Sequence, residues 1–209
     1  MGIRDRNLAH ALKTPLAIIL NETELHKGPL ADVVNKQSDM MRRQVDHYLR
    51  RARAVGGTKI ITSRTEVLPV LKDISRALAI IHKDKHFSLS PPSTPEDLLF
   101  RGERQDLEEM VGNLMENAAK WADSKIVVSC AREGEKLLLQ VADDGPGIAK
   151  EVRESVFMRG ERLDEKMPGT GLGLSIVKDL AGLYGGKIQL LDNEPHGLLA
   201  RLTLPAVVI

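Results

Sequence analysis

Aromatic side chains are scarce in this sequence, and their scarcity limits the kind of core that it can form. Only 3% of the 209 residues are Phe, Trp or Tyr, whereas 42% are hydrophobic, so the core must consist mainly of Leu, Ile, Val, Ala and Met. This composition suits helices and a thin sheet better than a β-sandwich rich in aromatic residues. The length is enough for one ordinary domain or two small ones.

Cysteine, net charge and long apolar runs are also lacking. The single cysteine, Cys130, excludes an internal disulfide framework and a zinc site with several cysteine ligands, and we expect it to be a buried strand residue. The net charge of +1 gives no indication of nucleic-acid binding. No apolar run approaches the ~20 residues that span a membrane, and the first residues lack the apolar segment of a signal peptide. We therefore expect a soluble, cytoplasmic chain.

Residues 1–57 carry the pattern of a helical hairpin. Their second half has an apolar stripe whose spacing alternates between four and three through three heptads, which is typical of a coiled-coil seam. The stripe consists of Val34, Ser38, Met41, Val45, Tyr48, Ala52 and Val55. Gly28-Pro29 predicts the turn before it. Because two helices bury such a stripe poorly, we expect a second copy of the chain to complete a dimeric four-helix bundle.

Gly56-Gly57 predicts the boundary between this hairpin and a second domain over residues 58–209. Beyond the boundary, helical and strand patterns alternate as in a layered α/β fold, so the whole chain is assigned to the α+β class. Helical periodicity is found at 67–81, 107–121 and 172–184. The apolar stripes of the first two consist of Val67, Leu71, Ile74, Leu78 and Ile81, and of Leu107, Val111, Leu114, Ala118 and Trp121. Short apolar runs predict strands at 59–62, 87–89, 98–100, 126–128, 137–141, 187–191 and 198–204.

A first glycine-containing motif follows the strand predicted at 137–141. Asp143 can accept a hydrogen bond from an exocyclic amine, and Gly145 and Gly147 allow the backbone to turn sharply and to approach a flat ligand closely. Alone, this Asp-Asp-Gly-Pro-Gly run is equally compatible with an ordinary turn between a strand and a loop.

A second cluster, Gly169-Thr170-Gly171-Leu172-Gly173, opens the third predicted helix. Free N–H groups at a helix N-terminus, with no Cβ atom to block the approach, can bind a phosphate. A flexible loop with a glycine-rich helix start is the alternative. The cluster is neither the dinucleotide fingerprint nor a Walker loop, because no Gly-x-Gly-x-x-Gly opens a strand–helix unit and no Gly-Lys-Ser/Thr follows.

The helix predicted at 107–121 carries a polar face beside its apolar one. Asn113 and Asn117 are four residues apart and therefore project from the same face. Their amide oxygens can complete the shell of a Mg²⁺ ion that phosphate oxygens and water already surround. Either asparagine alone is also compatible with the capping of a loop.

The order of these three motifs, with roughly 25 residues between them, resembles the ATP-binding fold shared by histidine kinases, gyrase B, Hsp90-type chaperones and MutL. The resemblance implies an α/β sandwich that holds ATP and Mg²⁺ under a mobile lid. It implies that Asp143 binds the adenine amine, that Asn117 ligates Mg²⁺ and that Asn113 lies near the transferred phosphate. The other residues implied to line the nucleotide from the two glycine motifs are Gly145, Gly147, Ile148, Gly169, Thr170, Gly171, Leu172 and Gly173.

Further contacts follow from the same resemblance. Lys120 is implied to contact phosphates. Trp121 stands where histidine kinases usually have Tyr, and it is implied to stack on adenine or ribose. The lid is implied to span residues 148–170, anchored by Phe157. Two lid arginines are implied to approach the γ-phosphate, Arg159 and Arg162.

Residues 8–16 read Leu-Ala-His-Ala-Leu-Lys-Thr-Pro-Leu and resemble the phosphoacceptor box of histidine kinases, with a look closest to the PhoQ-type sensor kinases. This resemblance implies that His10 accepts the γ-phosphoryl group, since a neutral imidazole nitrogen is a competent nucleophile toward phosphorus. Thr14 lies one helical turn further on and can orient a water molecule or a partner's carboxylate. Most family members carry an acidic residue directly after the phosphoacceptor, whereas this chain has Ala11.

The combined resemblance implies a homodimeric, ATP-dependent protein-histidine kinase of a two-component system. The catalytic residues that it implies are His10, Thr14, Asn113 and Arg162. We expect the phosphoryl group to pass to an aspartate in the receiver domain of a response regulator, and the same core to act as a regulator phosphatase. Two alternatives stay open: a weakly active kinase that serves mainly as a phosphatase or scaffold, and a gyrase- or chaperone-like ATPase. Because the sequence begins nine residues before His10, we expect a cytoplasmic fragment of an inner-membrane receptor.

Overall fold

The computed structural model describes residues 15, 18, 19, 23, 28–31, 33–35, 37, 38, 41, 63–90, 98–158 and 171–207. The chain divides into two compact units, Met1–Thr58 and Lys59–Ile209, and each is described by itself. None of the described helices is long and apolar enough to cross a membrane.

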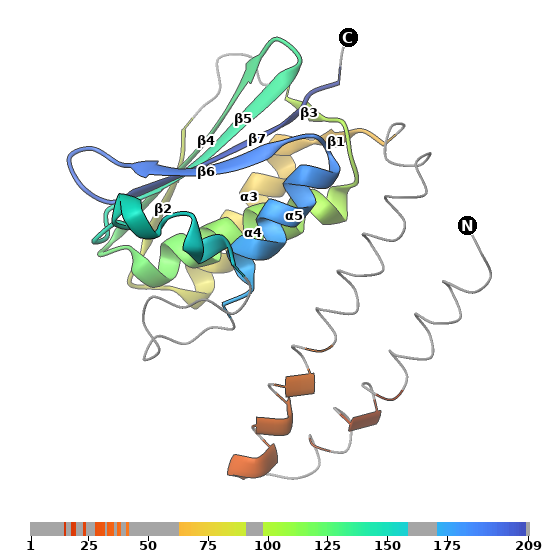
Figure 1. Ribbon diagram of the computed structural model, residues 1–209, viewed down its shortest axis with the longest axis vertical. Helices are drawn as coiled ribbons and strands as arrows, with labels where there is room; N and C mark the ends of the chain where they lie inside the picture. Colours follow the sequence, from red (N-terminus) through yellow and green to blue (C-terminus); the bar gives the residue numbers. More distant parts are fainter. Residues whose placement is uncertain are drawn as a thin grey trace. The chain divides into compact units, whose positions relative to one another are not determined.

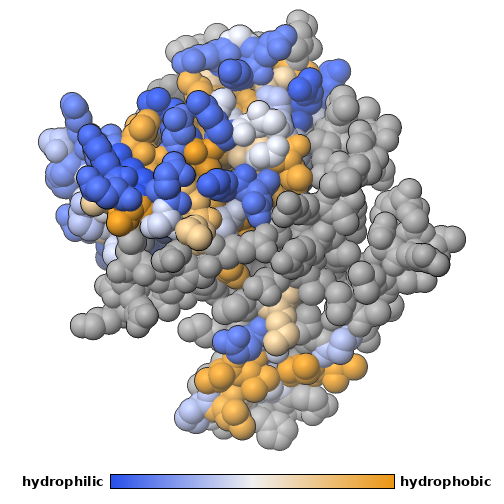
Figure 2. Space-filling view, in the orientation of Figure 1, coloured by the Kyte–Doolittle hydropathy of each residue, from blue (hydrophilic) through white to orange (hydrophobic). Residues whose placement is uncertain are grey.

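The first unit is helical at the described positions on both sides of Gly28. The hydroxyl of Thr23 donates a hydrogen bond to the carbonyl of Ile19 (2.9 Å) and also contacts the side chain of Asn35, which lies beyond Gly28 in the sequence. Several large apolar side chains are exposed on this unit, and Figure 2 shows apolar surface there: Ile18, Ile19, Leu30, Val33 and Met41. Most residues of the predicted seam lie outside the described residues, so the dimeric bundle stays a prediction.

The second unit contains a five-stranded sheet that is covered on one face by three helices (Figure 1). The strands follow one another in the order β2 (His86–Leu89), β4 (Lys125–Glu133), β5 (Lys136–Asp143), β7 (Leu198–Pro205) and β6 (Lys187–Asp192). β2 pairs with β4 in parallel, and the other neighbours pair antiparallel. The parallel pair is possible because the chain between β2 and β4 is long enough to include a helix.

The central hairpin of β4 and β5 buries alternate residues. On β5, Leu137, Leu139 and Val141 are buried and the residues between them are half-buried, which is the period-two pattern of a sheet with one covered face. Gly134 closes the hairpin with a φ of +60°, where glycine is favoured. Cys130 is buried on β4 as predicted, and burial raises the pKa of its thiol to about 12. The predicted hairpin is confirmed, and both strands are longer than predicted.

Three helices confirm the predicted ones: α3 (Val67–Ile81), α4 (Arg104–Trp121) and α5 (Gly173–Leu183). The buried stripe of α4 follows the predicted spacing of four and three residues and consists of Leu107, Val111, Leu114 and Ala118. Because this stripe packs toward the sheet, the polar face of α4 points away from the sheet.

One predicted detail is wrong. Ile81 was expected in the buried stripe of α3 but is 70% exposed, because the stripe ends one turn earlier at Leu78. The strand predicted at 98–100 is confirmed. It forms β3 (Leu99–Phe100), which pairs with β1 (Thr65–Glu66) in a separate two-stranded sheet, and Phe100 makes an isolated bridge with Ala206. The strand predicted at 59–62 lies outside the described residues.

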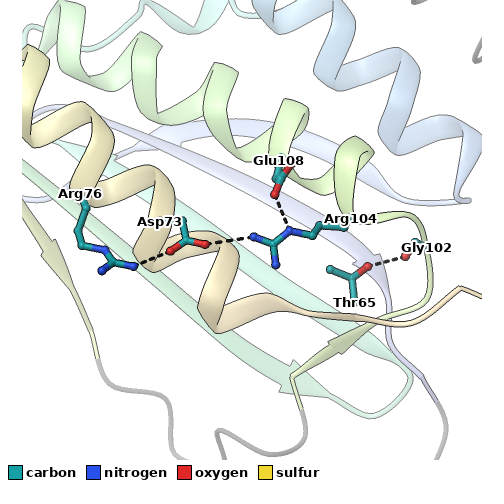
Figure 3. A network of polar contacts seen from close by, with 6 residues as sticks. All are labelled: Thr65, Asp73, Arg76, Gly102, Arg104 and Glu108. Atoms are coloured by element: carbon teal, nitrogen blue, oxygen red, sulfur yellow. Dashed lines mark hydrogen bonds and ion pairs between the residues drawn. The ribbon is translucent and has the colours of Figure 1, made fainter.

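Polar contacts align α3 with the beginning of α4 (Figure 3). The guanidinium of Arg104 donates to Asp73 of α3 (3.1 Å) and to Glu108 (2.6 Å), and Asp73 also accepts from Arg76 (2.6 Å). The hydrogen bond from Arg76, opposed in part by burial and assisted by Arg104, lowers the pKa of Asp73. These side chains are between 42% and 76% exposed, so the contacts add little to the stability of the fold.

A buried hydrogen bond joins α4 to the end of α5. The hydroxyl of Tyr184 donates to the carboxylate of Asp106 (2.5 Å) and accepts a hydrogen bond from the backbone N–H of Glu103 (3.3 Å). Burial and the contact with Asp106 raise the pKa of Tyr184. The two helices that carry the asparagines and the second glycine motif are therefore held against each other.

Candidate functional site

The carboxylate of Asp143 lies at the end of β5 and is buried, with 4% of the residue exposed. Its Oδ1 accepts hydrogen bonds from the backbone N–H groups of Gly145 (3.0 Å) and Leu198 (3.2 Å), whereas its Oδ2 has no hydrogen-bond partner among the described residues. Burial raises the pKa of Asp143; the two N–H donors oppose this, and the charges of Asp144 and Asp123 reinforce it. A buried carboxylate with one oxygen available can accept a hydrogen bond from an amine of a ligand.

The neighbouring carboxylate of Asp144, in contrast, forms hydrogen bonds within the fold. It accepts hydrogen bonds from the backbone N–H groups of Ser124 and Lys125 and from the Ser124 hydroxyl, each at 2.9 Å. Burial acts in the opposite direction, but these donors lower the pKa of Asp144 to about 2. Asp144 therefore fixes the beginning of β4, and of the two adjacent carboxylates only Asp143 has an oxygen left for a ligand.

Close backbone approaches around Asp143 require glycine. A Cβ atom on Gly145 would lie 2.1 Å from the carbonyl oxygen of Trp121, at the end of α4. A Cβ atom on Gly197 would lie 1.9 Å from the carbonyl oxygen of Asp143, and Gly197 has a φ of +116°. Gly147 has a φ of +72°. The first motif is thus packed between the end of α4 and the loop that connects β6 to β7.

That β6–β7 loop is a part of the site that the sequence did not indicate. The side-chain N–H group of Asn193 donates to the carbonyl of Asp143 (2.9 Å), and its backbone N–H donates to the carbonyl of Gly197 (3.1 Å). Together with the N–H of Leu198, these contacts hold Asp143 from the side opposite α4. An Asn and a Gly four residues apart indicate a turn but give no sign of which residue it supports.

The asparagine motif meets the second glycine motif. The side-chain N–H group of Asn113 donates to the carbonyl of Glu109 (2.7 Å), so its Oδ1 is the atom that faces α5. A Cβ atom on Gly173 would lie 3.0 Å from this Oδ1. Gly171 has a φ of +67°, and among the described residues no side chain caps the first turn of α5, which follows Leu172. The first N–H groups of α5 are therefore available to an anion beside Asn113.

The remaining predicted residues of α4 lie on the same polar face. Asn117 is half-buried and makes no side-chain hydrogen bond among the described residues. The ammonium of Lys120 forms an ion pair with Glu116 (3.2 Å). Trp121 is half-buried, with its carbonyl against Gly145. Among the described residues, no group of three or more His, Cys, Asp or Glu side chains could hold a metal ion.

Arg153 holds the segment that follows the first motif. Its Nε donates to the carbonyl of Ile148 (2.9 Å), its Nη1 donates to the carbonyl of Leu190 (3.4 Å), and its guanidinium forms an ion pair with Asp192 of β6. The side chain is only 13% exposed. Ile148 was predicted to line the ligand, whereas Arg153 was missed because an arginine between two acidic residues has no distinctive pattern.

Phe157 lies in a short 3₁₀ helix, Ser155–Phe157, and is buried against α5. The ammonium of Lys178 lies 5.1 Å from the centre of its ring. The beginning of the predicted lid is therefore fixed at both Ile148 and Phe157. Six predicted site residues lie outside the described residues: His10, Thr14, Arg159, Arg162, Gly169 and Thr170.

The arrangement fits an elongated ligand with different chemistry at its two ends. Asn113 contacts Gly173, and eight residues later the end of α4 contacts Gly145, so the two glycine motifs are separated by about 12 Å along the helix. The end at Asp143 accepts hydrogen bonds, and the end at α5 donates them. A flat, amine-bearing group at the first and an anionic chain at the second satisfy both.

Comparison with known proteins identifies the family of this chain. A family model described as histidine kinase-, DNA gyrase B-, and HSP90-like ATPase matches residues 102–208. Sensor protein kinase CarS of Pseudomonas aeruginosa is 38% identical over 203 residues, which are 95% of this chain and 45% of that protein. Sensor protein PhoQ of Escherichia coli is 35% identical over 188 residues, 87% of this chain and 38% of that protein. The chain therefore spans less than half the length of these relatives.

Solved structures show the same fold. Mycobacterial sensor histidine kinase MprB superposes with a TM-score of 0.62 and 27% identity, over 70% of this chain and 99% of that one. Full-length ShkA in complex with AMPPNP superposes with a TM-score of 0.72 and 22% identity, over 99% of this chain and 46% of that one.

Proposed function

The chain belongs to the family of histidine kinase-, DNA gyrase B- and HSP90-like ATPases, and from this premise we propose that it is the catalytic core of a sensor histidine kinase that transfers the γ-phosphoryl group of Mg-ATP to His10. The observation that carries the proposal is the approach of Asn113, in the middle of α4, to Gly173 and of Trp121, at the end of α4, to Gly145. These contacts assemble three sequence motifs into one site. The names of its relatives, sensor kinases, favour a kinase over the other members of the family.

Adenine recognition is assigned to the end of β5. Oδ2 of Asp143 accepts the hydrogen bond of the exocyclic amine, while Oδ1 stays bound to the N–H groups of Gly145 and Leu198. The specificity arises because a ligand without the amine leaves this buried oxygen unpaired, which costs ~1–3 kcal/mol. Trp121 and Ile148 provide apolar surface beside the ring.

Phosphate binding is assigned to the beginning of α5 and the polar face of α4. The uncapped N–H groups of α5 bind the phosphate chain, assisted by Gly169, Thr170, Gly171 and Lys120. The amide oxygens of Asn117 and Asn113 fit Mg²⁺, a hard cation that takes oxygen ligands and retains those of phosphate and water. When bound, this ion offsets the negative charge of the phosphates. A lid arginine, Arg159 or Arg162, offsets the charge that develops during transfer.

The acceptor is assigned to the first unit. An imidazole nitrogen of His10 forms the new N–P bond as the bond between the γ-phosphorus and its bridging oxygen breaks, and ADP leaves with that oxygen. We assign Thr14 to the phosphatase reaction, in which it positions the water molecule that hydrolyses the aspartyl phosphate of the response regulator and releases inorganic phosphate. The same account includes a homodimer formed by the first unit, the passage of the phosphoryl group to an aspartate of a response-regulator receiver domain, and a place on the cytoplasmic side of a longer membrane receptor.

A weakly active kinase that serves mainly as a regulator phosphatase is the second candidate. One observation favours it: Ala11 follows His10, where an acidic residue would act as a base. The second candidate and the first share the nucleotide site and the phosphoacceptor, and they differ in the rate of autophosphorylation.

Incubation with γ-labelled ATP tests the proposal against a gyrase- or chaperone-like ATPase. We expect label on the protein that is lost in acid and retained in base, as a phosphoramidate is. Free labelled phosphate without labelled protein would contradict the kinase assignment. Addition of a labelled core to candidate receiver domains then measures transfer, and incubation of phosphorylated receiver domains with the core measures phosphatase activity.

A further inference from the structure

The carboxylate of Glu116 is shared between two cationic or hydrogen-bonding partners. Its Oε1 accepts the ammonium of Lys120 at 3.2 Å, and its Oε2 lies 3.1 Å from Nε2 of His82, the residue that follows α3. The side chains are 36% exposed for Glu116, 29% for Lys120 and 20% for His82. The three groups thus form one partly buried cluster between α3 and α4, and neither helix supplies it alone.

This cluster lies on the helix face that carries the asparagines. Lys120 is seven residues, or nearly two full turns, beyond Asn113, so the two side chains project in almost the same direction. Glu116 is one turn before Lys120 and directly precedes Asn117. The acidic side chain of Glu116 therefore lies beside the groups that are assigned to an anionic ligand. It already forms an ion pair with Lys120, the one lysine assigned to that ligand.

We infer that Glu116 is a specificity-determining residue that competes with the phosphate chain of the ligand for Lys120, and that His82 is a positioning residue that retains Glu116 when Lys120 leaves. The inference rests on the proposed nucleotide site. A ligand that recruits Lys120 must break the Lys120–Glu116 pair. A ligand without phosphates leaves the pair intact, so Glu116 lowers the affinity for ATP and leaves the affinity for adenosine unchanged.

His82 reduces the cost of this exchange. Because Oε2 of Glu116 is bound to His82 through a separate oxygen, the carboxylate keeps one partner after Lys120 turns to the ligand. The same contact holds the carboxylate toward α3, away from the incoming phosphates. Without His82, Glu116 would have Lys120 as its sole partner in the cluster and would release it less readily.

The first test compares the binding of ATP and of adenosine to the whole chain by calorimetry. Glu116→Gln is expected to bind ATP about 1.4- to fivefold more tightly than the wild type, since an exposed pair is worth ~0.2–1 kcal/mol and 1.4 kcal/mol is tenfold. Its affinity for adenosine is expected to be unchanged. Glu108→Gln is the matched control, because it removes the same charge from α4 where the partner is Arg104. Unchanged or weaker ATP binding by Glu116→Gln, or an equal gain in both variants, would overturn the inference.

The second test asks whether His82 acts through Glu116. His82→Ala is expected to weaken ATP binding about twofold in the wild-type background and to have no effect in the Glu116→Gln background. His82→Gln, which keeps a donor within reach of the carboxylate, is expected to bind ATP as the wild type does. An equal loss in both backgrounds would assign His82 a general structural role and contradict the inference. If the wild type bound neither ATP nor adenosine, the proposed site itself would be wrong, and that outcome differs from every result above.

Discussion

Oδ1 of Asn113 lies so close to Gly173 that a Cβ atom on this glycine would come within 3.0 Å of it. The contact joins the middle of α4 to the first residue of α5, and it leaves the N–H groups of α5 open beside an amide oxygen. A Cβ atom at residue 173 would require Asn113 to shift by a few tenths of an ångström. A substitution at residue 173 should therefore change the affinity for ATP without lowering the stability of the fold.

Gly173→Ala is expected to weaken ATP binding a few-fold without loss of stability. The added methyl group requires Asn113 to shift by a few tenths of an ångström and narrows the approach to the helix N-terminus, whereas Ala is a better helix former than Gly by up to ~1 kcal/mol. Calorimetric titration and thermal unfolding measure the two effects. Gly182→Ala is the matched control in the same helix, since a Cβ atom there would meet nothing within 4 Å, and it should raise stability while ATP affinity stays the same. Normal ATP binding by Gly173→Ala would contradict the assignment of this helix start.

Asp143→Asn and Asp144→Asn are expected to have opposite effects. Asp143→Asn replaces an acceptor with a donor opposite the adenine amine, so adenosine affinity should fall by ~1–3 kcal/mol. Its stability at neutral pH should be equal to or higher than that of the wild type, because burial raises the pKa of Asp143 and ionisation of this carboxyl opposes folding. Asp144→Asn should bind adenosine normally and lose about 1 kcal/mol of stability.

The pH dependence of stability distinguishes the two carboxyl groups further. The pKa of Asp144 is lowered from 3.8 to about 2 in the folded protein, so its carboxylate stabilises the fold above the ordinary value and this contribution is lost as the pH falls toward 2. The difference in unfolding free energy between the wild type and Asp144→Asn should therefore shrink across that interval. A difference that stays constant with pH would show that the hydrogen bonds from Ser124 and Lys125 are not the cause.

Arg153→Lys is expected to weaken adenosine binding a few-fold. Lysine can keep the ion pair with Asp192 but cannot also donate to the carbonyls of Ile148 and Leu190, so the segment after the first glycine motif loses its fixed position. Lys150→Ala is the control, because Lys150 pairs with the same aspartate at 3.5 Å while 75% of its side chain is exposed. Equal affinities in Arg153→Lys and the wild type would show that the segment is held by other contacts.

Ala11→Glu is expected to raise the single-turnover rate of autophosphorylation at saturating ATP. A carboxylate beside His10 holds the imidazole in one tautomer and can accept its proton, and general-base help is typically worth ~10²–10⁴-fold. Quenched-flow measurement of protein labelling gives the rate. An unchanged or lower rate would show that the base is supplied elsewhere or is unnecessary, and it would remove the reason to regard the native chain as a weak kinase.

Local patterns in the sequence were sufficient to predict the helices and strands that position the site. The stripes of α3 and α4 and the alternation along β4 and β5 follow from burial on one face, so the periodicity predicts them. The two-residue strands β1 and β3 were not predicted as a pair, because they are too short to show a period. The exposed Ile81 was assigned to the core because its spacing is correct and only the tertiary structure shows where the stripe ends.

The contacts that support the site could not be predicted from the sequence, because they join segments that are distant along the chain. Asn193, Gly197 and Leu198 reach Asp143 from a loop some 50 residues later, and no local pattern indicates this pairing. His82, which follows α3, and Glu116 of α4 likewise come from separate segments. Glycine and asparagine motifs can be recognised because single residues carry a conformational or chemical requirement, whereas the residues that hold them are chosen by the packing of distant segments.

The most direct test of the account measures protein labelling and nucleotide affinity together in His10→Gln. The account predicts that labelling from γ-labelled ATP is abolished while the dissociation constant for ATP stays within about twofold of the wild type, because the phosphoacceptor and the nucleotide site belong to different units. Acid-labile label that persists in His10→Gln would contradict the assignment of His10 as the phosphoacceptor.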